Sequence, residues 1–201
     1  MKEYSNIEII NEDILKSDLK YINSFENIIT VSNIPYYITS PLIELFIKKL
    51  TALKSATFMV QKEVGDRICA KVGTKDYNAF SIMVQYFAIT TKIVNVPRTC
   101  FTPEPNVDSI VIKIERFERS FRPKNEELFE RIVYASFKER RKMLVNNLSN
   151  EFKLSKEEIK NILEGLNIDS QIRAELLSID DFINLTNTLE KYIAKWGILW
   201  V

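Results

Sequence analysis

With 201 residues, 46% of them apolar and 27% charged, and a formal net charge of +1, the chain has the composition of an ordinary globular protein without a general basic character. It has no histidine and two cysteines, which excludes a serine–histidine triad and histidine-bound metals and argues against a disulfide scaffold or a zinc site. No apolar run is long enough to span a membrane and the first residues do not form a signal peptide, so we expect a cytoplasmic protein.

The first predicted elements are two short strands separated by an acidic turn. Residues 7–10 form an apolar strand, and Asp13 follows it. By its chemistry alone, Asp13 is a turn or capping residue. Residues 27–31 form a second, buried strand, and a turn with the sequence Asn-Ile-Pro-Tyr follows it at residues 33–36. Ligands of open α/β sheets bind at the carboxyl ends of strands, so we expect this turn to carry a binding site.

The residue types of this turn suit a planar ring that carries an exocyclic amine. Pro35 keeps Ile34 out of a helical conformation and has no N–H of its own. The side-chain oxygen of Asn33 and the carbonyl of Pro35 are then placed to accept the two N–H bonds of such an amine. The ring of Tyr36 is placed to stack on the face of that planar ring.

Helices and strands alternate through the middle of the chain. Apolar spacing predicts a helix from Ser40 to Leu50, a strand at 56–60, a helix from Gln61, an exposed loop at 71–78, a buried helix at 79–88, and strands at 92–96 and 107–114. By chemistry alone, Lys62 and Arg67 form a solvated helix face. Residues 101–105 cannot be regular structure because two prolines flank one residue. By chemistry alone, Phe101 at the head of this loop is a core residue.

The composition changes after residue 116. Residues 118–125 are charged, contain a proline and have no apolar period, so we expect a linker. Helical patterns follow it, with one helix at 126–148, one that begins with a capping box at Ser155 and closes at Gly165, and one that runs from Ser178 to about Lys195. The apolar tail at 196–201 has no assigned role.

The turn at 33–36 resembles the Asn-(Leu/Ile)-Pro-Tyr motif of the S-adenosylmethionine-dependent rRNA adenine N6-dimethyltransferases. The resemblance is closest to the family that dimethylates two adjacent adenosines near the 3′ end of small-subunit rRNA. Further blocks follow in the family's order at 61–64, 81–86, 101–105, 107–109 and 137–148. The resemblance implies an α/β fold with part of a Rossmann-like methyltransferase sheet at 1–117, the linker at 118–125 and a small all-helical RNA-binding domain at 126–201.

This resemblance implies roles for individual residues. Asn33, Pro35 and Tyr36 would hold a flipped target adenine, and Phe101 would contact it from the opposite side. Asp13 and Ile14, together with Asn33, would hold the cofactor S-adenosylmethionine. The partner would be small-subunit rRNA or its pre-ribosomal particle, and no metal is implied. The residues expected to contact RNA are Lys62, Arg67, Lys138, Arg140, Arg141 and Lys142, although the last four also fit a solvated helix end.

A glycine-rich loop for the cofactor is absent from the sequence. Folds that bind S-adenosylmethionine begin with a strand, a glycine-rich turn and a helix that receives the polar end of the cofactor. The four glycines, at 65, 73, 165 and 197, are too far apart to form that turn. The resemblance implies two strand–helix units ahead of residue 7. We therefore expect weak or no cofactor binding by this chain, together with either re-pairing of the first strand or self-association through an unpaired sheet edge.

Two alternatives to the small-subunit enzyme remain. The large-subunit dimethyltransferases that confer macrolide resistance share the blocks at 33–36 and 101–105, but residues 137–142 and 146–148 resemble the small-subunit family better. A non-catalytic RNA-binding or ribosome-assembly factor would agree with the absent glycine-rich loop. The sequence does not determine the exact target adenosines or the oligomeric state.

Overall fold

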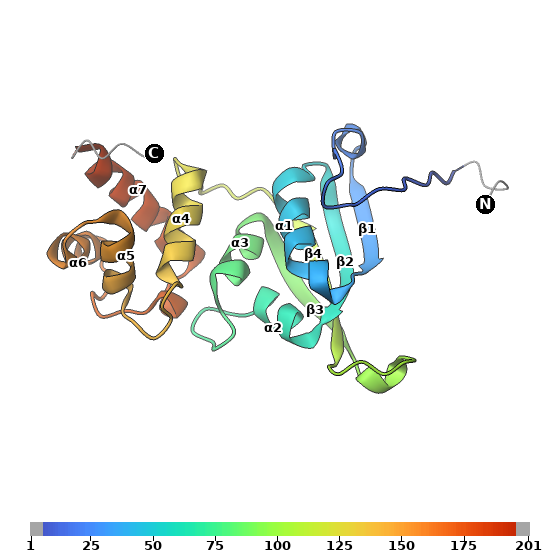
Figure 1. The fold of residues 1–201 in the computed structure, drawn as a ribbon. Helices are drawn as coiled ribbons and strands as arrows, with labels where there is room; N and C mark the ends of the chain where they lie inside the picture. The colour runs from blue at the N-terminus through green and yellow to red at the C-terminus, as the bar shows by residue number, and fades with distance from the viewer. Residues whose placement is uncertain (1–5, 196–201) are drawn as a thin grey trace.

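A computed structural model of the protein describes residues 6–195 (Figure 1). Its described part contains a four-stranded sheet with the order β1-β2-β4-β3. Strand β1 is parallel to β2, whereas β4 is antiparallel to both β2 and β3, so the sheet is mixed. The strands are β1 (Ile28–Asn33), β2 (Leu53–Gln61), β3 (Ala88–Val96) and β4 (Ser109–Arg116).

Helices lie against one face of this sheet and also form a separate group beside it (Figure 1). The first three are α1 (Thr39–Lys49), α2 (Lys62–Ile68) and α3 (Ala79–Phe87). The separate group contains α4 (Glu126–Ser136), α5 (Leu144–Phe152), α6 (Lys156–Gly165) and α7 (Ile179–Lys195). Short 3-10 turns are η1 (Ile22–Ser24), η2 (Tyr36–Ile38), η3 (Arg98–Cys100) and η4 (Ala174–Leu176).

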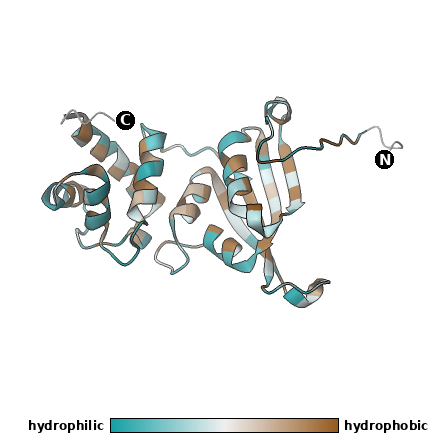
Figure 2. Cartoon of the chain, in the orientation of Figure 1, coloured by the Kyte–Doolittle hydropathy of each residue, from teal (hydrophilic) through white to brown (hydrophobic). Residues whose placement is uncertain are grey.

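The two faces of the sheet differ in burial. Alternate residues of β2 and β4, including Phe58 and Ile112, are buried beneath α1, α2 and α3. On the other face, Ile29 and Val31 of β1 are exposed, and no helix or strand within residues 6–195 covers them. Figure 2 shows the apolar residues of β1 at the edge of the sheet.

The predicted strand at 7–10 is wrong. These residues form no strand, and Ile7, Ile9 and Ile10 are exposed. A strand requires a hydrogen-bonded neighbour, and the N-terminal segment instead extends away from the sheet (Figure 1). As a result, β1 is an edge strand that pairs only with β2 in the described part of the chain.

The helical group and the sheet share helix α3. Val84 of α3 packs in the core of the sheet. Ile82, Met83 and Tyr86 of the same helix pack in the core formed by α4 to α7. Residues 117–125 between the two parts contain no helix or strand. The core of the helical part therefore includes residues that precede the predicted linker.

The single helix predicted at 126–148 is wrong, because a turn at 137–143 separates α4 from α5. The side-chain amide of Asn147 donates to the carbonyls of Ser136 (2.7 Å) and Glu139 (3.3 Å). It thereby satisfies the Ser136 carbonyl, which the end of α4 leaves without a helical partner, and also binds the turn that follows.

The starts of the later helices are confirmed. The capping box at Ser155 is formed with Glu158. At the start of α7, the Asp181 amide donates to the Ser178 hydroxyl (3.1 Å). The apolar tail at 196–201 lies outside the described residues.

Candidate active site

The turn after β1 lies at the carboxyl end of the parallel pair β1–β2. Ile34 as a whole is 1% exposed, and its amide donates to the carbonyl of Met59 on β2 (3.2 Å). This anchor fixes the turn to the sheet. Pro35 then leads the chain into η2, so that Asn33 is exposed and Tyr36 is half-buried.

The hydrogen bonds of this turn revise the expected acceptor pair. The Pro35 carbonyl already accepts from the Ile38 amide (3.1 Å) and from the Thr39 hydroxyl (3.4 Å). A carbonyl oxygen has two lone pairs, so neither remains for a ligand. Within residues 6–195, the Ile34 carbonyl and the Asn33 side chain accept no hydrogen bond. The open acceptors, meaning those without a hydrogen bond, are therefore the exposed Asn33 side chain and the carbonyl of Ile34, a residue that is itself buried. The sequence motif does not reveal this, because it does not show which carbonyl closes the 3-10 turn.

The ring of Tyr36 is tied to the sheet through its hydroxyl group. The hydroxyls of Tyr36 and Ser109 share a hydrogen bond of 2.7 Å. Ser109 is the first residue of β4 and is completely buried. The sequence blocks include Ser109, but nothing in them indicates a contact with a residue 73 positions earlier.

Phe101 lies in the loop between β3 and β4, which projects beyond the end of the sheet (Figure 1). This loop is closed by its own polar contacts. The Arg98 amide donates to the Asp108 carboxylate (2.9 Å), and the Arg98 guanidinium pairs with Glu104 (2.8 Å). The loop that carries Phe101 thus lies at the end of the sheet where β1 and β2 deliver their turns.

A pocket of about 620 Å³ lies beside this loop. Residues of α2, of the 71–78 loop and of the β3–β4 loop line it. Its charged side chains are mixed in sign: Lys62, Lys75 and Arg98 face Glu63, Asp66, Asp76 and Asp108. The pocket is therefore not a uniformly basic groove.

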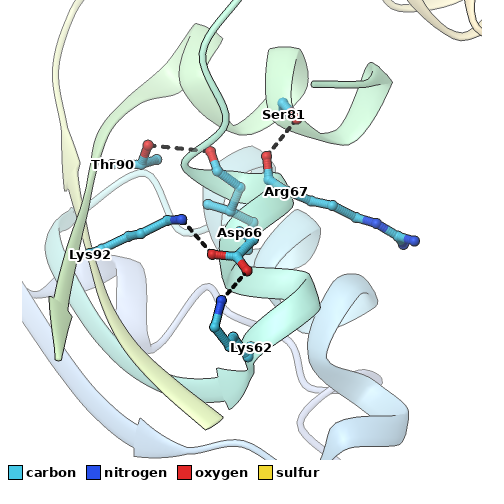
Figure 3. A network of polar contacts seen from close by, with 7 residues as sticks. Lys62, Asp66, Arg67, Ser81, Thr90 and Lys92 are labelled. Atoms are coloured by element: carbon cyan, nitrogen blue, oxygen red, sulfur yellow. Dashed lines mark hydrogen bonds and ion pairs between the residues drawn. The ribbon is translucent and has the colours of Figure 1, made fainter. Parts of the chain in front are cut away.

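Two residues that were expected to contact RNA have carboxylate partners on their own helix. Lys62 donates to Asp66 (2.6 Å), which also pairs with Lys92 of β3 (Figure 3). Arg67 pairs with Glu63 one turn away. Burial alone would raise the pKa of Asp66, but the hydrogen bonds and charges of the two lysines outweigh it and lower that pKa. The hydrogen bond to Asp66 is the main cause of a raised pKa at Lys62.

Replacing Asp66 by asparagine should lower the free energy of unfolding by about 1 kcal/mol at neutral pH, because two partly exposed ion pairs contribute roughly 0.2–1 kcal/mol each. The folded state lowers the pKa of Asp66. Its contribution is therefore present above the unfolded pKa of about 4 and is lost as the pH falls through the folded pKa. Urea unfolding of both proteins at neutral and acidic pH measures this effect. An equal difference at both pH values would contradict the assignment.

The basic residues of the segment 138–142 lie in the turn between α4 and α5 and are exposed. Arg140 donates to the carbonyl of Lys75 (2.6 Å), which fastens this turn to the 71–78 loop. Lys142 pairs with Glu139 (2.8 Å), and Lys138 lies 4.0 Å from Glu151. Arg141 has no ion-pair partner within residues 6–195. Figure 1 shows α2, the 71–78 loop and the α4–α5 turn along the same side of the molecule.

The residues expected to bind the cofactor do not form a complete site. The Asp13 carboxylate accepts from the Leu15 amide (3.0 Å) and lies 3.7 Å from the Lys16 ammonium group, all within one exposed turn. Within residues 6–195, neither Asp13 nor Ile14 forms a hydrogen bond with Asn33. These contacts use only part of the acceptor capacity of an exposed carboxylate, so the role of Asp13 at the cofactor stays a prediction.

Comparisons with known proteins agree with the geometry of the turn at 33–36. Residues 1–191 match the family model described as ribosomal RNA adenine dimethylase. The chain belongs to the ribosomal RNA adenine dimethylase family. The family prediction and the α/β methyltransferase fold are thus confirmed. The family consists of S-adenosylmethionine-dependent methyltransferases.

Curated relatives of this family align with almost the whole chain. It is 40% identical over 199 residues to ribosomal RNA small subunit methyltransferase A of Geobacillus sp. (strain WCH70), covering 94% of this chain and 68% of that protein. It is 42% identical over 206 residues to the protein of the same name from Bacillus cytotoxicus, covering 96% and 69%. The chain therefore spans about two thirds of the length of these relatives.

Solved structures of the family share the fold. A dimethyladenosine transferase from Plasmodium falciparum is similar with a TM-score of 0.76 and 29% identity, over 98% of this chain and 76% of that one. The 23S rRNA methyltransferase ErmE is similar with a TM-score of 0.65 and 20% identity, over 94% and 74%, which shows the fold alone.

Two further findings concern the described residues of this family member. Between residues 6 and 195, no group of three or more cysteine, aspartate and glutamate side chains is arranged to hold a metal ion. In the same part of the chain, no helix is both long and apolar enough to cross a membrane.

Proposed function

We propose that this protein is an rRNA (adenine-N6,N6)-dimethyltransferase that acts on adjacent adenosines near the 3′ end of small-subunit rRNA in the cytoplasm. The observation that carries the proposal is the pair of open acceptors at Asn33 and Ile34 beside the half-buried ring of Tyr36. These groups match the two N–H bonds and the flat face of adenine. The curated relatives named small subunit methyltransferases support the choice of rRNA.

In this proposal the turn activates the adenine amine. The lone pair of the N6 nitrogen is delocalised into the ring, which makes the amine a poor nucleophile. Acceptors at Asn33 and Ile34 would hold the N–H bonds out of the ring plane and localise the lone pair on nitrogen. Orientation and fixed dipoles then supply the rate enhancement, and no strong general base is required. The methyl donor in this family is S-adenosylmethionine.

The target base must leave its stack to reach this turn. Tyr36 would stack on one face of the extruded ring, and Phe101 on the projecting loop would contact the other. After the first methyl transfer, the amine keeps only one N–H. The site must then bind the monomethylated base with one acceptor unpaired, so stacking contributes more to the second step than to the first.

For RNA binding we propose phosphate contacts by Lys138, Arg141 and Lys142 in the α4–α5 turn of a helical domain at 126–201. Arg140 fastens that turn to the 71–78 loop and acts on RNA only indirectly. Lys62 and Arg67 would exchange their carboxylate partners for phosphates when RNA binds. Folded rRNA would be recognised mainly through its shape and backbone.

Replacing both Arg141 and Lys142 by glutamate should weaken binding to small-subunit particles and flatten its salt dependence by roughly one unit of slope for each lost phosphate contact. Filter binding over a range of salt concentrations measures both effects. The matched control replaces Lys156 and Lys160 of α6 by glutamate, which changes the net charge equally. Equal affinities and slopes in the two variants would show that the α4–α5 turn does not bind phosphate.

The test of the proposed function is methylation of small-subunit particles whose rRNA lacks the modification. The protein is incubated with these particles and with millimolar S-adenosylmethionine, and the rRNA is analysed by mass spectrometry. We expect N6,N6-dimethyladenosine at two adjacent positions near the 3′ end. Methylation of large-subunit rRNA instead would support the macrolide-resistance type. Tight particle binding without methylation would support an assembly factor.

S-adenosylmethionine should bind this chain weakly, with little heat detected by calorimetry at micromolar concentrations. The reason is that the four glycines of this sequence are too far apart to form a glycine-rich loop for the polar end of the cofactor. The open edge of β1 should also cause self-association, since unpaired N–H and C=O groups form a template for another strand. Light scattering measures this second effect. Micromolar cofactor binding by a monodisperse monomer would contradict both expectations.

A further inference from the structure

Ser109 lies on a strand that has a hydrogen-bonded neighbour on each side. It is the first residue of β4, where its backbone is paired with Gln61 of β2 and with Val96 of β3. Its side chain is completely buried, and its hydroxyl shares the 2.7 Å hydrogen bond with Tyr36. A strand residue paired on both sides is among the least mobile positions of a sheet, so the Ser109 hydroxyl is a rigid anchor.

Tyr36 needs such an anchor because its own segment is short. It opens η2, a turn of three residues whose first position has no side-chain cap. The next residue, Tyr37, has the same side chain in the same turn but is 85% exposed and has no hydrogen bond within residues 6–195. The two tyrosines therefore differ in one respect that matters here: only the Tyr36 ring is held at its far end.

Asp108, the residue before Ser109, forms hydrogen bonds with two other segments of the site. The Asp108 carbonyl accepts from the Lys62 amide at the start of α2 (2.9 Å). The Asp108 carboxylate accepts from the Arg98 amide in the loop that carries Phe101 (2.9 Å). Two consecutive residues thus connect the turn after β1, helix α2 and the Phe101 loop.

We propose that Ser109 is a positioning residue that holds the Tyr36 ring in the orientation required for stacking on the extruded base. The hydrogen bond uses the phenol oxygen at the edge of the ring and leaves the face of the ring for a ligand. This inference rests on the proposed function, in which Tyr36 stacks on adenine. Without the bond, the half-buried ring would populate other side-chain orientations, and the extruded base would be held less often.

The experiment uses small-subunit rRNA particles in which 2-aminopurine replaces a target adenine, because its fluorescence rises when the base leaves its stack. This base has no N6 amine, so its extrusion depends on stacking by Tyr36 and not on the acceptors at Asn33 and Ile34. Ser109→Ala and Tyr36→Phe each remove the shared hydrogen bond. Each should lower the ratio of extruded to stacked base about fivefold, the effect of one typical hydrogen bond, while the affinity for the particle stays the same. The double variant should be no worse than either single variant, and Ser109→Thr should restore the ratio. Tyr37→Phe is the matched control and should change nothing.

The outcomes separate the inference from the proposed function. If Tyr36→Ala abolishes base extrusion while Ser109→Ala and Tyr36→Phe leave it unchanged, the positioning role is overturned and the stacking role stands. Additive losses in the double variant would also overturn the positioning role. If Tyr36→Ala has no effect, the stacking role itself fails. Should Ser109→Ala prove unstable in urea unfolding, Tyr36→Phe removes the same bond from the half-buried side and decides the question.

Discussion

Replacing Asn33 by alanine should lower the rate of methyl transfer about a hundredfold, which corresponds to the roughly 3 kcal/mol lost when one oriented polar group is removed from an active site. Asn33 is exposed on the turn and its amide has no hydrogen bond within residues 6–195. The substitution therefore breaks no contact that stabilises the fold. The affinity for small-subunit particles should remain nearly unchanged, because the amide acts only on the extruded base.

Single-turnover methylation of small-subunit particles at millimolar S-adenosylmethionine measures this rate. The matched control is Asn150→Ala, which removes an exposed amide side chain from α5, away from the turn. A rate for Asn33→Ala within threefold of the unmodified protein would show that the adenine amine is not held by this side chain.

Replacing Gly65 by alanine should lower the free energy of unfolding by about 1–3 kcal/mol, the usual cost of overpacking a core. A Cβ atom at Gly65 would lie 2.3 Å from Cγ2 of Ile110 and 3.2 Å from Cγ2 of Ile112. Both isoleucines of β4 are buried, so neither methyl group has space to move. At a solvent-exposed position inside a helix, glycine to alanine would raise the free energy of unfolding by about 1 kcal/mol. The contact with β4 therefore decides whether the substitution at Gly65 stabilises or destabilises the fold.

Gly165 provides the matched control. It lies at the end of α6, and a Cβ atom there would meet nothing within 4 Å. Gly165→Ala should therefore leave the stability unchanged or raise it. Urea unfolding of the two variants at neutral pH compares them directly. Equal free energies of unfolding for Gly65→Ala and Gly165→Ala would show that α2 does not pack closely on β4 as the structure describes.

Local sequence patterns correctly predicted those elements that are formed by residues close together in the sequence. The turn at 33–36 and the capping box at Ser155 depend on residues within a few positions of one another, and both are present. The strand at 7–10 is absent because strand formation depends on a neighbour, which no local pattern supplies. The helix predicted at 126–148 is divided because Asn147 turns back onto the end of α4.

In the candidate site, too, contacts between residues far apart in the sequence were not predicted. The motif located Asn33 and Tyr36, but it placed the second acceptor on Pro35, whose carbonyl closes the 3-10 turn. The anchor at Ser109 is 73 residues away from Tyr36 in the sequence. The carboxylate partners of Lys62 and Arg67 were visible at helical spacing, yet only the structure shows that Lys92 joins Asp66 from another strand.

Because α3 packs in both hydrophobic cores, we expect the sheet and the helical group to unfold as one cooperative unit. Val84 is held by the sheet, and one residue earlier Met83 is held by the helices. Neither part completes its packing unless α3 is in place. Cutting the chain at the linker would strip α4 of the surface on which Phe129 and Ile132 pack. Unfolding of the helical group would remove packing partners from α3 and so weaken the sheet that supports the turn at Asn33. The proposed RNA-binding part and the proposed adenine site should therefore be lost together.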